Sequence, residues 1–396
     1  MPEQWINWSG SLRFTPQEYA VPGDEAAVVA LVQRAREAGV KVRPVGSGHS
    51  SSPLVRTDGI LVSLDEFTDV PPVGGSNRQV AVGAGARLRH LGEGLSHLGL
   101  AMENLGDVDY QTIAGAVATG THGTGIHFGN LSTQVAGVRL VTGTGAVLEI
   151  SEQEHPELLP AARLSLGALG IVTRITLRLQ PHFDVDRMLW CAPIDWILAH
   201  LPELQQQNRN MDFYWYPRDD LTEIRTVNHR GQTPEGQPPR PPKKHRAGPS
   251  YREIPQQRHL RFEEIEYSLP STAFPDCFAQ VRKRIKERHR VGVAWRVLVR
   301  TIAADDIHLS NAHGRATTTI ACLQNAGLPN EAYFTDMEAI FRDHDGRPHW
   351  GKQHSLTAAQ LRPLYPAWEA FRQIRRSLDP DDVFLTPDLA RLLEEA

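Results

Sequence analysis

Apolar residues recur at every third or fourth position over residues 24–39, and this spacing predicts an amphipathic helix. Acidic residues open the segment and a glycine closes it, as is usual at the two ends of a helix. Short apolar runs at residues 41–45, 59–64 and 79–82 predict strands, and residues 86–98 predict a second helix. This alternation indicates an α/β unit in the first third of the chain.

A hairpin is predicted over residues 136–150, where two apolar segments flank a Gly-Thr-Gly turn. Part of the sheet is therefore expected to be antiparallel. Residues 174–179 form the last predicted strand of this unit, and we expect a second unit to begin after Leu179. Helical patterns return over residues 358–396, on both sides of a turn at residues 378–382.

The clearest break lies at residues 231–255, which hold six prolines between residues 232 and 249 and a basic run from Lys243 to Arg246. We interpret this segment as a mobile surface loop of the second unit. The alternative is a nucleic-acid patch, but the basic run lacks interleaved aromatic residues.

Composition supports the same interpretation, because the 396 residues carry a formal net charge of -4 and no global basic field. The N-terminus lacks the layout of a secretory signal, and no apolar run approaches the ~18 residues of a membrane span.

Cys191, Cys277 and Cys322 fit neither a metal motif nor a disulfide framework. We expect three small buried hydrophobes in a cytoplasmic protein without metal, membrane or nucleic-acid partners.

The strongest short motif is RPVGSGHS at residues 43–50, which follows a predicted strand. Gly46 and Gly48 allow a tight turn in which successive backbone amides converge on an anion such as a phosphate. A plain strand-to-loop turn rich in small residues is the alternative. The motif is not a dinucleotide fingerprint, because the third glycine and the following helix are missing.

Two further stretches of small residues change the balance between these alternatives. Residues 104–125 contain five glycines with threonines between them, and residues 165–173 read SLGALGIVT. So many small residues suit a backbone that passes close to a flat ligand or its phosphates. Together with the first motif, these stretches indicate one extended, phosphate-bearing cofactor.

These segments, with RPHWGK at residues 347–352 and LDPDDVFLTPDL at 378–389, resemble the vanillyl-alcohol-oxidase superfamily of FAD proteins. The similarity is greatest to its aldonolactone and alditol oxidase branch, which includes gulonolactone, arabinonolactone and xylitol oxidases. The resemblance implies an α+β fold. It implies a two-subdomain, PCMH-type FAD domain over residues 1–180, an α/β cap domain over residues 181–345, and a segment 346–396 that returns to the FAD domain.

The resemblance also implies the cofactor site, with the histidine at position 49 bonded covalently to the flavin 8α-methyl group. The implied FAD-binding residues are Pro44, Val45, Gly46, Ser47, Gly48, His49, Ser50, Gly106, Asp107, Gly115, Thr119, Gly120, His122, Gly123, Thr124, Gly170, Ile171, Val172, His349 and Lys352.

Two cations, Lys352 and Arg300, are the catalytic residues that the resemblance implies. Oxidation of an alcohol removes a proton from oxygen and a hydride from carbon, so fixed positive charge would stabilise the developing alkoxide. The alternatives are a snorkelling surface lysine for Lys352 and a structural ion pair of Arg300 with Asp305 or Asp306. The implied reaction is oxidation of a polyol, sugar lactone or related alcohol by hydride transfer to flavin N5, with O2 as electron acceptor.

Two positions depart from the branch on the substrate side. Leu298 stands where the branch usually has a glutamate, and Ala321 stands where alditol oxidases have a histidine. A leucine cannot accept a hydrogen bond from a polyol hydroxyl. We therefore expect a less hydroxylated, modified or larger substrate, or an intermediate of a specialised pathway. A flavin-binding protein without oxidase chemistry is the alternative.

Overall fold

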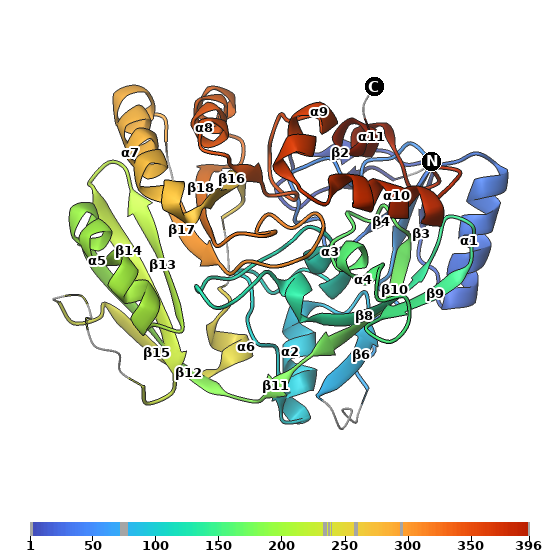
Figure 1. Ribbon diagram of the computed structural model, residues 1–396, viewed down its shortest axis with the longest axis horizontal. Helices are drawn as coiled ribbons and strands as arrows, with labels where there is room; N and C mark the ends of the chain where they lie inside the picture. Colours follow the sequence, from blue (N-terminus) through green and yellow to red (C-terminus); the bar gives the residue numbers. More distant parts are fainter. Residues whose placement is uncertain are drawn as a thin grey trace.

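The computed structural model describes residues 3–71, 78–232, 236, 238, 240–256, 260–293 and 296–394. The described elements form two lobes, with the first third of the chain on one side and a large sheet on the other (Figure 1). Both ends of the chain lie on the side of the first lobe.

The first lobe begins with a parallel three-stranded sheet in the order β3-β5-β4. Its strands are β3 (Glu18–Ala20), β4 (Val42–Val45) and β5 (Ile60–Ser63). Helix α1 (Glu25–Glu37) confirms the first predicted helix, and Asp24 caps it by accepting a hydrogen bond from the Ala27 amide. Its apolar stripe is buried against the strands, so the periodicity of the sequence shows which face packs inward.

A second sheet of the same lobe has four antiparallel strands in the order β6-β10-β8-β9. They are β6 (Gln79–Gly83), β8 (Val135–Val141), β9 (Val147–Ser151) and β10 (Ile171–Arg178). Strands β8 and β9 form the predicted hairpin, and β10 confirms the strand that was expected to end the unit. The helices of this part are α2 (Leu88–His97), α3 (Ile113–Ala118) and α4 (Leu159–Ala162). Short two-stranded pairings complete the lobe: β1 (Trp5–Ile6) with β2 (Arg13–Phe14), and β7 (Leu100–Ala101) with β11 (Gln180–Pro181).

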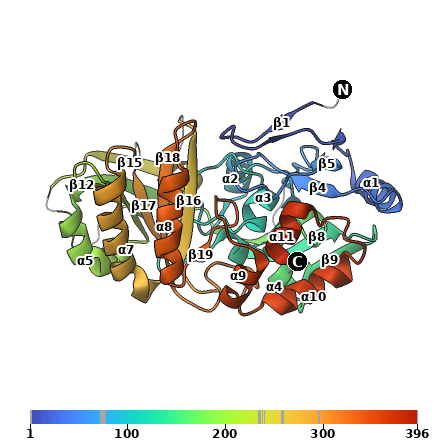
Figure 2. The ribbon, with the colours of Figure 1, turned by 90° about the horizontal axis from the view of Figure 1, so that it is seen from above.

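The second lobe is built on an antiparallel sheet of eight strands in the order β15-β12-β14-β13-β17-β18-β16-β19. These strands are β12 (Asp184–Pro193), β13 (Asn210–Tyr216), β14 (Leu221–His229), β15 (Lys244–Pro249), β16 (Phe262–Pro270), β17 (Val297–Ile302), β18 (Thr317–Asn325) and β19 (Arg347–Pro348). Helices α5 (Ile194–Gln207), α7 (Phe274–Arg284) and α8 (Glu331–Asp343) lie side by side on one face of this sheet (Figure 2).

Side chains of the large sheet alternate between these helices and the opposite face. Phe213 and Trp215 make edge contacts with Phe278 of α7, and Tyr267 stacks on Phe341 of α8. The residues between them therefore project from the other face, toward the first lobe.

The segment 231–255 differs from the surface loop that its composition predicts. Lys244–Pro249 forms the edge strand β15, which pairs along β12, and Ser250–Glu253 forms the short helix α6. The loop prediction is therefore wrong for residues 244–253. The backbone of β12 provides hydrogen-bond partners for β15, and amino-acid composition does not reveal such pairing. Residues 233–235, 237 and 239 lie outside the described residues.

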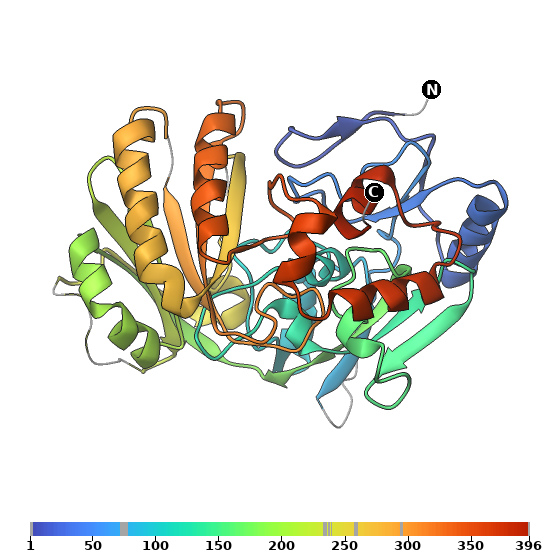
Figure 3. The ribbon, with the colours of Figure 1, turned by 45° about the horizontal axis from the view of Figure 1, so that its top comes forward.

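The C-terminal part crosses from the large sheet back to the first lobe, as Figure 3 shows. After β19 the chain forms the predicted helices α9 (Ala358–Leu361), α10 (Trp368–Leu378) and α11 (Pro387–Leu393). Lys41 donates a hydrogen bond to the Asp382 carbonyl, and the Val42 amide donates to the Val383 carbonyl. The end of the chain is thus packed on the strand that enters the first glycine-rich turn.

Arg43 of β4 is a buried cation that joins three segments. It donates to the backbone carbonyls of Leu54, Leu166, Gly167 and Phe384 at 2.6–3.0 Å. Burial lowers the pKa of the guanidinium to about 10, which leaves it charged at neutral pH. One side chain therefore links the first glycine-rich turn, the third one and the C-terminal segment.

Two of the three cysteines, Cys277 and Cys322, are buried as expected, and burial raises the pKa of each thiol to about 12. Cys191 is exposed, so the expectation of three buried cysteines is wrong at this position because its side chain lies on the open face of β12. Within the described part of the chain, no helix has the length and apolar character needed to cross a membrane.

We expect Arg43→Met to lower the free energy of unfolding by about 3 kcal/mol or more, because four buried carbonyls lose their donor. The control is Arg34→Met, which removes an exposed ion pair with Glu18 and should cost about 1 kcal/mol or less. Urea unfolding followed by circular dichroism measures both. Equal losses in the two variants would contradict the role assigned to Arg43.

Candidate active site

The three glycine-rich stretches meet along one groove of the first lobe. Eleven of the predicted cofactor residues line it: Pro44, Val45, Gly46, Ser47, Gly48, His49, Ser50, Gly115, Thr119, Gly170 and Val172. The groove is also lined by backbone and small side chains that the sequence interpretation did not single out, including Ala84, Gly85, Thr112, Ala118 and Gly167. The structure therefore assembles distant stretches into one elongated site, which we call the glycine groove.

Close packing explains the first glycine of the turn after β4. A Cβ atom at Gly46 would lie 2.3 Å from Thr112 Oγ1, so no larger residue fits there. Gly48 has a φ of +68°, a backbone conformation that glycine adopts without strain. Among the described residues, the backbone amides of Gly48, His49 and Ser50 donate to no protein acceptor. These amides fit an anionic group such as a phosphate.

A second hollow, which we call the charged pocket, lies between this groove and the large sheet. Its charged and titratable lining comes from both lobes: Asp107, His122, Glu264, Glu266, Arg300, His349 and Lys352. Trp8, Phe262, Leu298, Leu323 and Tyr214 add apolar surface. His49, Ser50, Gln111 and Thr119 line both hollows, so the groove and the pocket meet at these residues.

His49 stands at this junction between two aromatic rings. Its ring stacks on Trp8 at 4.8 Å and lies parallel to Tyr110 at 6.0 Å. Burial lowers the pKa of His49 to about 4, with help from the charges of Lys352 and Arg87. The imidazole is therefore neutral at neutral pH, with a lone pair available on one nitrogen.

Arg300 and Glu266 form a buried ion pair at one end of the charged pocket. Arg300 Nη2 lies 2.7 Å from Glu266 Oε1, and its Nη1 donates to the His122 carbonyl. Burial alone would raise the pKa of Glu266, but the adjacent Arg300 guanidinium outweighs it and holds that pKa well below its usual range. Arg300 is thus a fixed cation with a fixed partner, although not the Asp305 or Asp306 that its sequence neighbourhood suggests.

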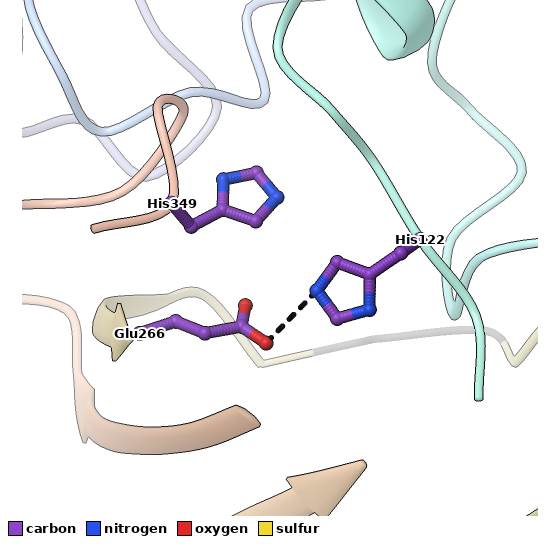
Figure 4. A group of neighbouring side chains, drawn as sticks. All are labelled: His122, Glu266 and His349. Carbon is purple, nitrogen blue, oxygen red and sulfur yellow. Dashed lines mark ion pairs between the residues drawn. The ribbon is translucent and has the colours of Figure 1, made fainter. Parts of the chain in front are cut away.

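His122, Glu266 and His349 form a compact group in which ligand atoms lie within 4.8 Å of one another (Figure 4). His122 Nδ1 donates to the Gly123 carbonyl, which leaves the lone pair of a neutral ring on Nε2, 3.1 Å from Glu266 Oε1. His349 Nδ1 accepts from the Gly351 amide, so its neutral ring carries the proton on Nε2. His349 in this tautomer is a hydrogen-bond donor, and Arg300 already supplies positive charge to Glu266. The His122 Nε2 lone pair and the Glu266 carboxylate therefore face each other as two acceptors, and Arg300 supplies the hydrogen bond that Glu266 Oε1 accepts.

Lys352 and Glu264 form the second ion pair of the pocket. Lys352 Nζ lies 2.7 Å from Glu264 Oε2, and the lysine side chain is 23% exposed. Burial raises the pKa of Glu264 above the ordinary glutamate value, against the opposing effect of Lys352. Lys352 is therefore a half-buried, paired cation, which differs from the snorkelling surface lysine that was its alternative.

The remaining predicted cofactor residues lie elsewhere. Gly106, Gly123 and Thr124 line a separate small hollow, to which Asp107 also contributes. Thr124 there links the lobes by donating to the Met211 carbonyl. Ile171 is fully buried in the core of the first lobe, and Gly120 packs near Leu164 and Asn311. The structure brings neither Ile171 nor Gly120 to the groove or the pocket.

The two carboxylates Glu264 and Glu266 are the functional residues that sequence reasoning missed. The sequence pattern that could have identified them is the run FEEIEYSL at residues 262–269. From Glu264 on, acidic and apolar residues alternate in this run, which is the spacing typical of a strand. Charges at alternate positions of an otherwise apolar strand point into one shared site. They restore acidic groups to the pocket from β16, although β17 carries Leu298.

Comparison with known proteins agrees with this geometry. Residues 16–151 match a family model described as an FAD binding domain, and residues 240–392 match D-arabinono-1,4-lactone oxidase. The chain is 35% identical to L-gulono-1,4-lactone dehydrogenase of Mycobacterium tuberculosis, over 98% of this chain and 99% of that protein. It is 27% identical to L-gulonolactone oxidase of Mus musculus, over 98% of both chains.

The fold is similar to that of solved cholesterol oxidases. The structure of the enzyme from B. sterolicum superposes with a TM-score of 0.84 at 17% identity, over 99% of this chain and 97% of that one. This similarity confirms the predicted α+β, PCMH-type fold with a cap over the FAD domain.

We expect Glu266→Gln to lower the free energy of unfolding by about 3–5 kcal/mol, because Arg300 would remain buried without its carboxylate. Glu263→Gln is the matched control, since Glu263 is also buried on β16 but accepts only from the Gln353 amide. It should cost about 1 kcal/mol or less. Urea unfolding of both variants tests the pair, and a Glu266→Gln variant as stable as its control would contradict it.

Proposed function

The chain belongs to the family of FAD-dependent aldonolactone oxidoreductases, and from this we propose that it oxidises a hydroxyl-bearing carbon of a sugar lactone, polyol or related alcohol. One observation carries the proposal. A groove that fits an elongated phosphate-bearing cofactor opens, at His49, into a pocket that holds a buried arginine, a half-buried lysine and two buried carboxylates.

The glycine groove supplies the cofactor contacts in this proposal. The free amides of Gly48, His49 and Ser50 would bind the FAD pyrophosphate, and Gly115, Gly170 and Val172 would lie along the rest of the molecule. Bound FAD supplies the hydride acceptor, which no side chain of the protein can provide.

The charged pocket supplies the proton chemistry. The Lys352 ammonium would donate to the substrate oxygen and stabilise negative charge that develops there. The Glu264 carboxylate beside it would accept the hydroxyl proton, and its raised pKa makes it a better base than an ordinary glutamate. Arg300 would add fixed positive charge, held in place by Glu266. The substrate carbon then loses a hydride as its oxygen becomes a carbonyl.

A covalent bond between His49 and the flavin is part of the proposal. Two observations support it. The His49 ring is stacked on Trp8 and lines both the glycine groove and the charged pocket. Its lowered pKa keeps the imidazole neutral. Only a neutral imidazole has the lone pair needed to form a bond to carbon. A C–H bond of the flavin 8α-methyl would break in exchange, its proton would be released, and its two electrons would remain on the flavin until the proposed acceptor O2 removes them.

The proposed electron acceptor is O2, and the proposed compartment is the cytoplasm. The relatives from Mus musculus and Bos taurus are named oxidases, whereas the M. tuberculosis relative is named a dehydrogenase. The exposed thiol of Cys191 supports a reducing compartment. Oxygen consumption compared with reduction of an artificial acceptor, after substrate addition, tests the first point directly.

We expect anaerobic addition of L-gulono-1,4-lactone or a related alcohol to bleach the flavin absorption. Lys352→Met should slow the bleaching about 10²–10³-fold, because it removes the charge opposite the developing oxyanion. Lys41→Met is the control, since Lys41 binds the Asp382 carbonyl and lines neither hollow. A flavin that no sugar lactone, polyol or related alcohol reduces would contradict the proposed function.

The pH dependence of bleaching tests the role of Glu264. A base must be ionised to accept a proton, so the rate should fall as the pH drops through the raised pKa of Glu264, above the ordinary value of about 4.3. Glu264→Gln should remove this acid limb and lower the plateau about 10²–10⁴-fold. An unchanged acid limb in the variant would assign the proton to another group.

A denaturing gel tests the covalent bond. Flavin fluorescence should migrate with the wild-type chain and be absent from His49→Ala. A conservative second variant, His49→Gln, keeps a side chain between Trp8 and Tyr110 and should also release its flavin on denaturation. Free flavin released from the wild-type protein would show that no bond forms.

A further inference from the structure

We propose that the charged pocket selects a substrate in which the hydroxyl-bearing carbon lies next to a hydrocarbon group, and that Tyr214, Leu298 and Leu323 bind this group. The proposal rests on the proposed function and names its substrate class. The preferred substrates are lactones or alcohols with an alkyl or aryl substituent where a sugar lactone carries a further hydroxyl.

The floor of the pocket follows one cross-strand row of the large sheet, from which Tyr214, Leu298 and Glu266 line the pocket. Tyr214 of β13 pairs with Leu298 of β17, Leu298 pairs with Ala321 of β18, and Ala321 pairs with Glu266 of β16. The row therefore runs from an aromatic ring over two aliphatic residues to the carboxylate that holds Arg300. Leu298 and Ala321 are direct cross-strand neighbours, so the two residues form a single apolar patch.

The neighbouring row extends this patch toward the proposed base. Leu323 of β18 pairs with Glu264 of β16, so an apolar side chain lies directly beside the carboxylate that would accept the hydroxyl proton. Tyr214, Leu298, Ala321 and Leu323 form an apolar cluster separate from the core behind the sheet, with Phe262 packed against it. Tyr214, Leu298, Leu323 and Phe262 also line the charged pocket, and Ala321 lies buried between them.

The polar atoms next to Leu298, on Tyr214 and Asp107, are engaged within the protein. The Tyr214 hydroxyl donates to Asp107 Oδ2 at 2.9 Å, and Asp107 Oδ1 lies 2.6 Å from Arg225 Nη1. Arg225 also pairs with the buried Asp212. A substrate hydroxyl placed against Leu298 would lose its hydrogen bonds to water and gain none in return.

The opposite wall continues the apolar surface. Trp8 makes an edge contact with Phe262 at 5.2 Å and stacks on His49 at the junction with the groove. A substrate held by Lys352 and Glu264 would therefore place its hydroxyl on the charged side and its neighbouring carbons against Tyr214, Leu298 and Leu323, with Trp8 and Phe262 completing the apolar lining. Hydrocarbon fills this space favourably.

Two 2-hydroxy-1,4-lactones provide a matched test with the FAD-loaded enzyme. Pantolactone carries two methyl groups on the carbon beside the hydroxyl, and threono-1,4-lactone carries a hydroxyl there. Anaerobic bleaching gives the rate, and perturbation of the flavin spectrum gives the dissociation constant. We expect pantolactone to be favoured at least about tenfold in the ratio of rate to dissociation constant.

Leu298→Glu should reverse this preference, because its carboxylate would accept from the added hydroxyl, whereas Leu298→Met should keep it. Leu323→Gln is a second polar variant on a different strand, should the first fail to fold. A wild-type preference for threono-1,4-lactone, or a preference unaltered by the polar variants, would overturn the proposal.

The two proposals fail in different ways. Binding of pantolactone at least tenfold tighter, without bleaching by either compound or by L-gulono-1,4-lactone, would refute the oxidation chemistry and support the apolar floor. Efficient bleaching by L-gulono-1,4-lactone, with weaker binding of pantolactone than of threono-1,4-lactone, would support the oxidation and refute the apolar floor.

Discussion

The guanidinium of Arg43 is the interaction on which the cofactor half of the molecule depends. It donates to carbonyls in three segments that are far apart in the chain, and one of these carbonyls belongs to Leu166. Leu166 has a φ of 55°, which is costly for a leucine and persists only where the surroundings determine it. Arg43 helps to hold Leu166 in this conformation, because its guanidinium donates to the Leu166 carbonyl and to the Leu54 carbonyl at the same time. The glycine groove is shaped by a residue that lies beneath it.

The charged pocket follows a related principle at its other end. Arg300 and Lys352 each have a carboxylate partner on β16, and the two carboxylates are one strand repeat apart. Pairing holds both cations in position before substrate arrives, and burial strengthens their effect on any charge that develops nearby. The cost of burying four charged groups is offset within the two pairs. The charge that we propose for catalysis and the structural stability thus rest on the same contacts.

Local patterns in the sequence were sufficient for the main elements of the first lobe and for the turn that carries His49. Helix α1, the hairpin β8–β9 and the glycine groove all follow from spacing and residue type within short segments. The partner of Arg300 could not be predicted from local patterns. Glu266 lies 34 residues away in the chain, and the register of β16, β18 and β17 brings it next to Arg300. The edge strand β15 was missed for a similar reason, since its pairing depends on β12. Ile171 was misplaced because alternation along β10 turns its side chain into the core.

The return of the chain through β19 has a consequence for how the protein is made. Lys352 and His349 enter the pocket from the last part of the chain, and the carbonyl of Phe384 completes the contacts of Arg43. During translation, the first lobe leaves the ribosome long before these residues are synthesised. A nascent chain in which these residues are not yet synthesised therefore lacks the last contact of Arg43 and two side chains of the charged pocket. The order of synthesis thus separates folding of the first lobe from assembly of the pocket.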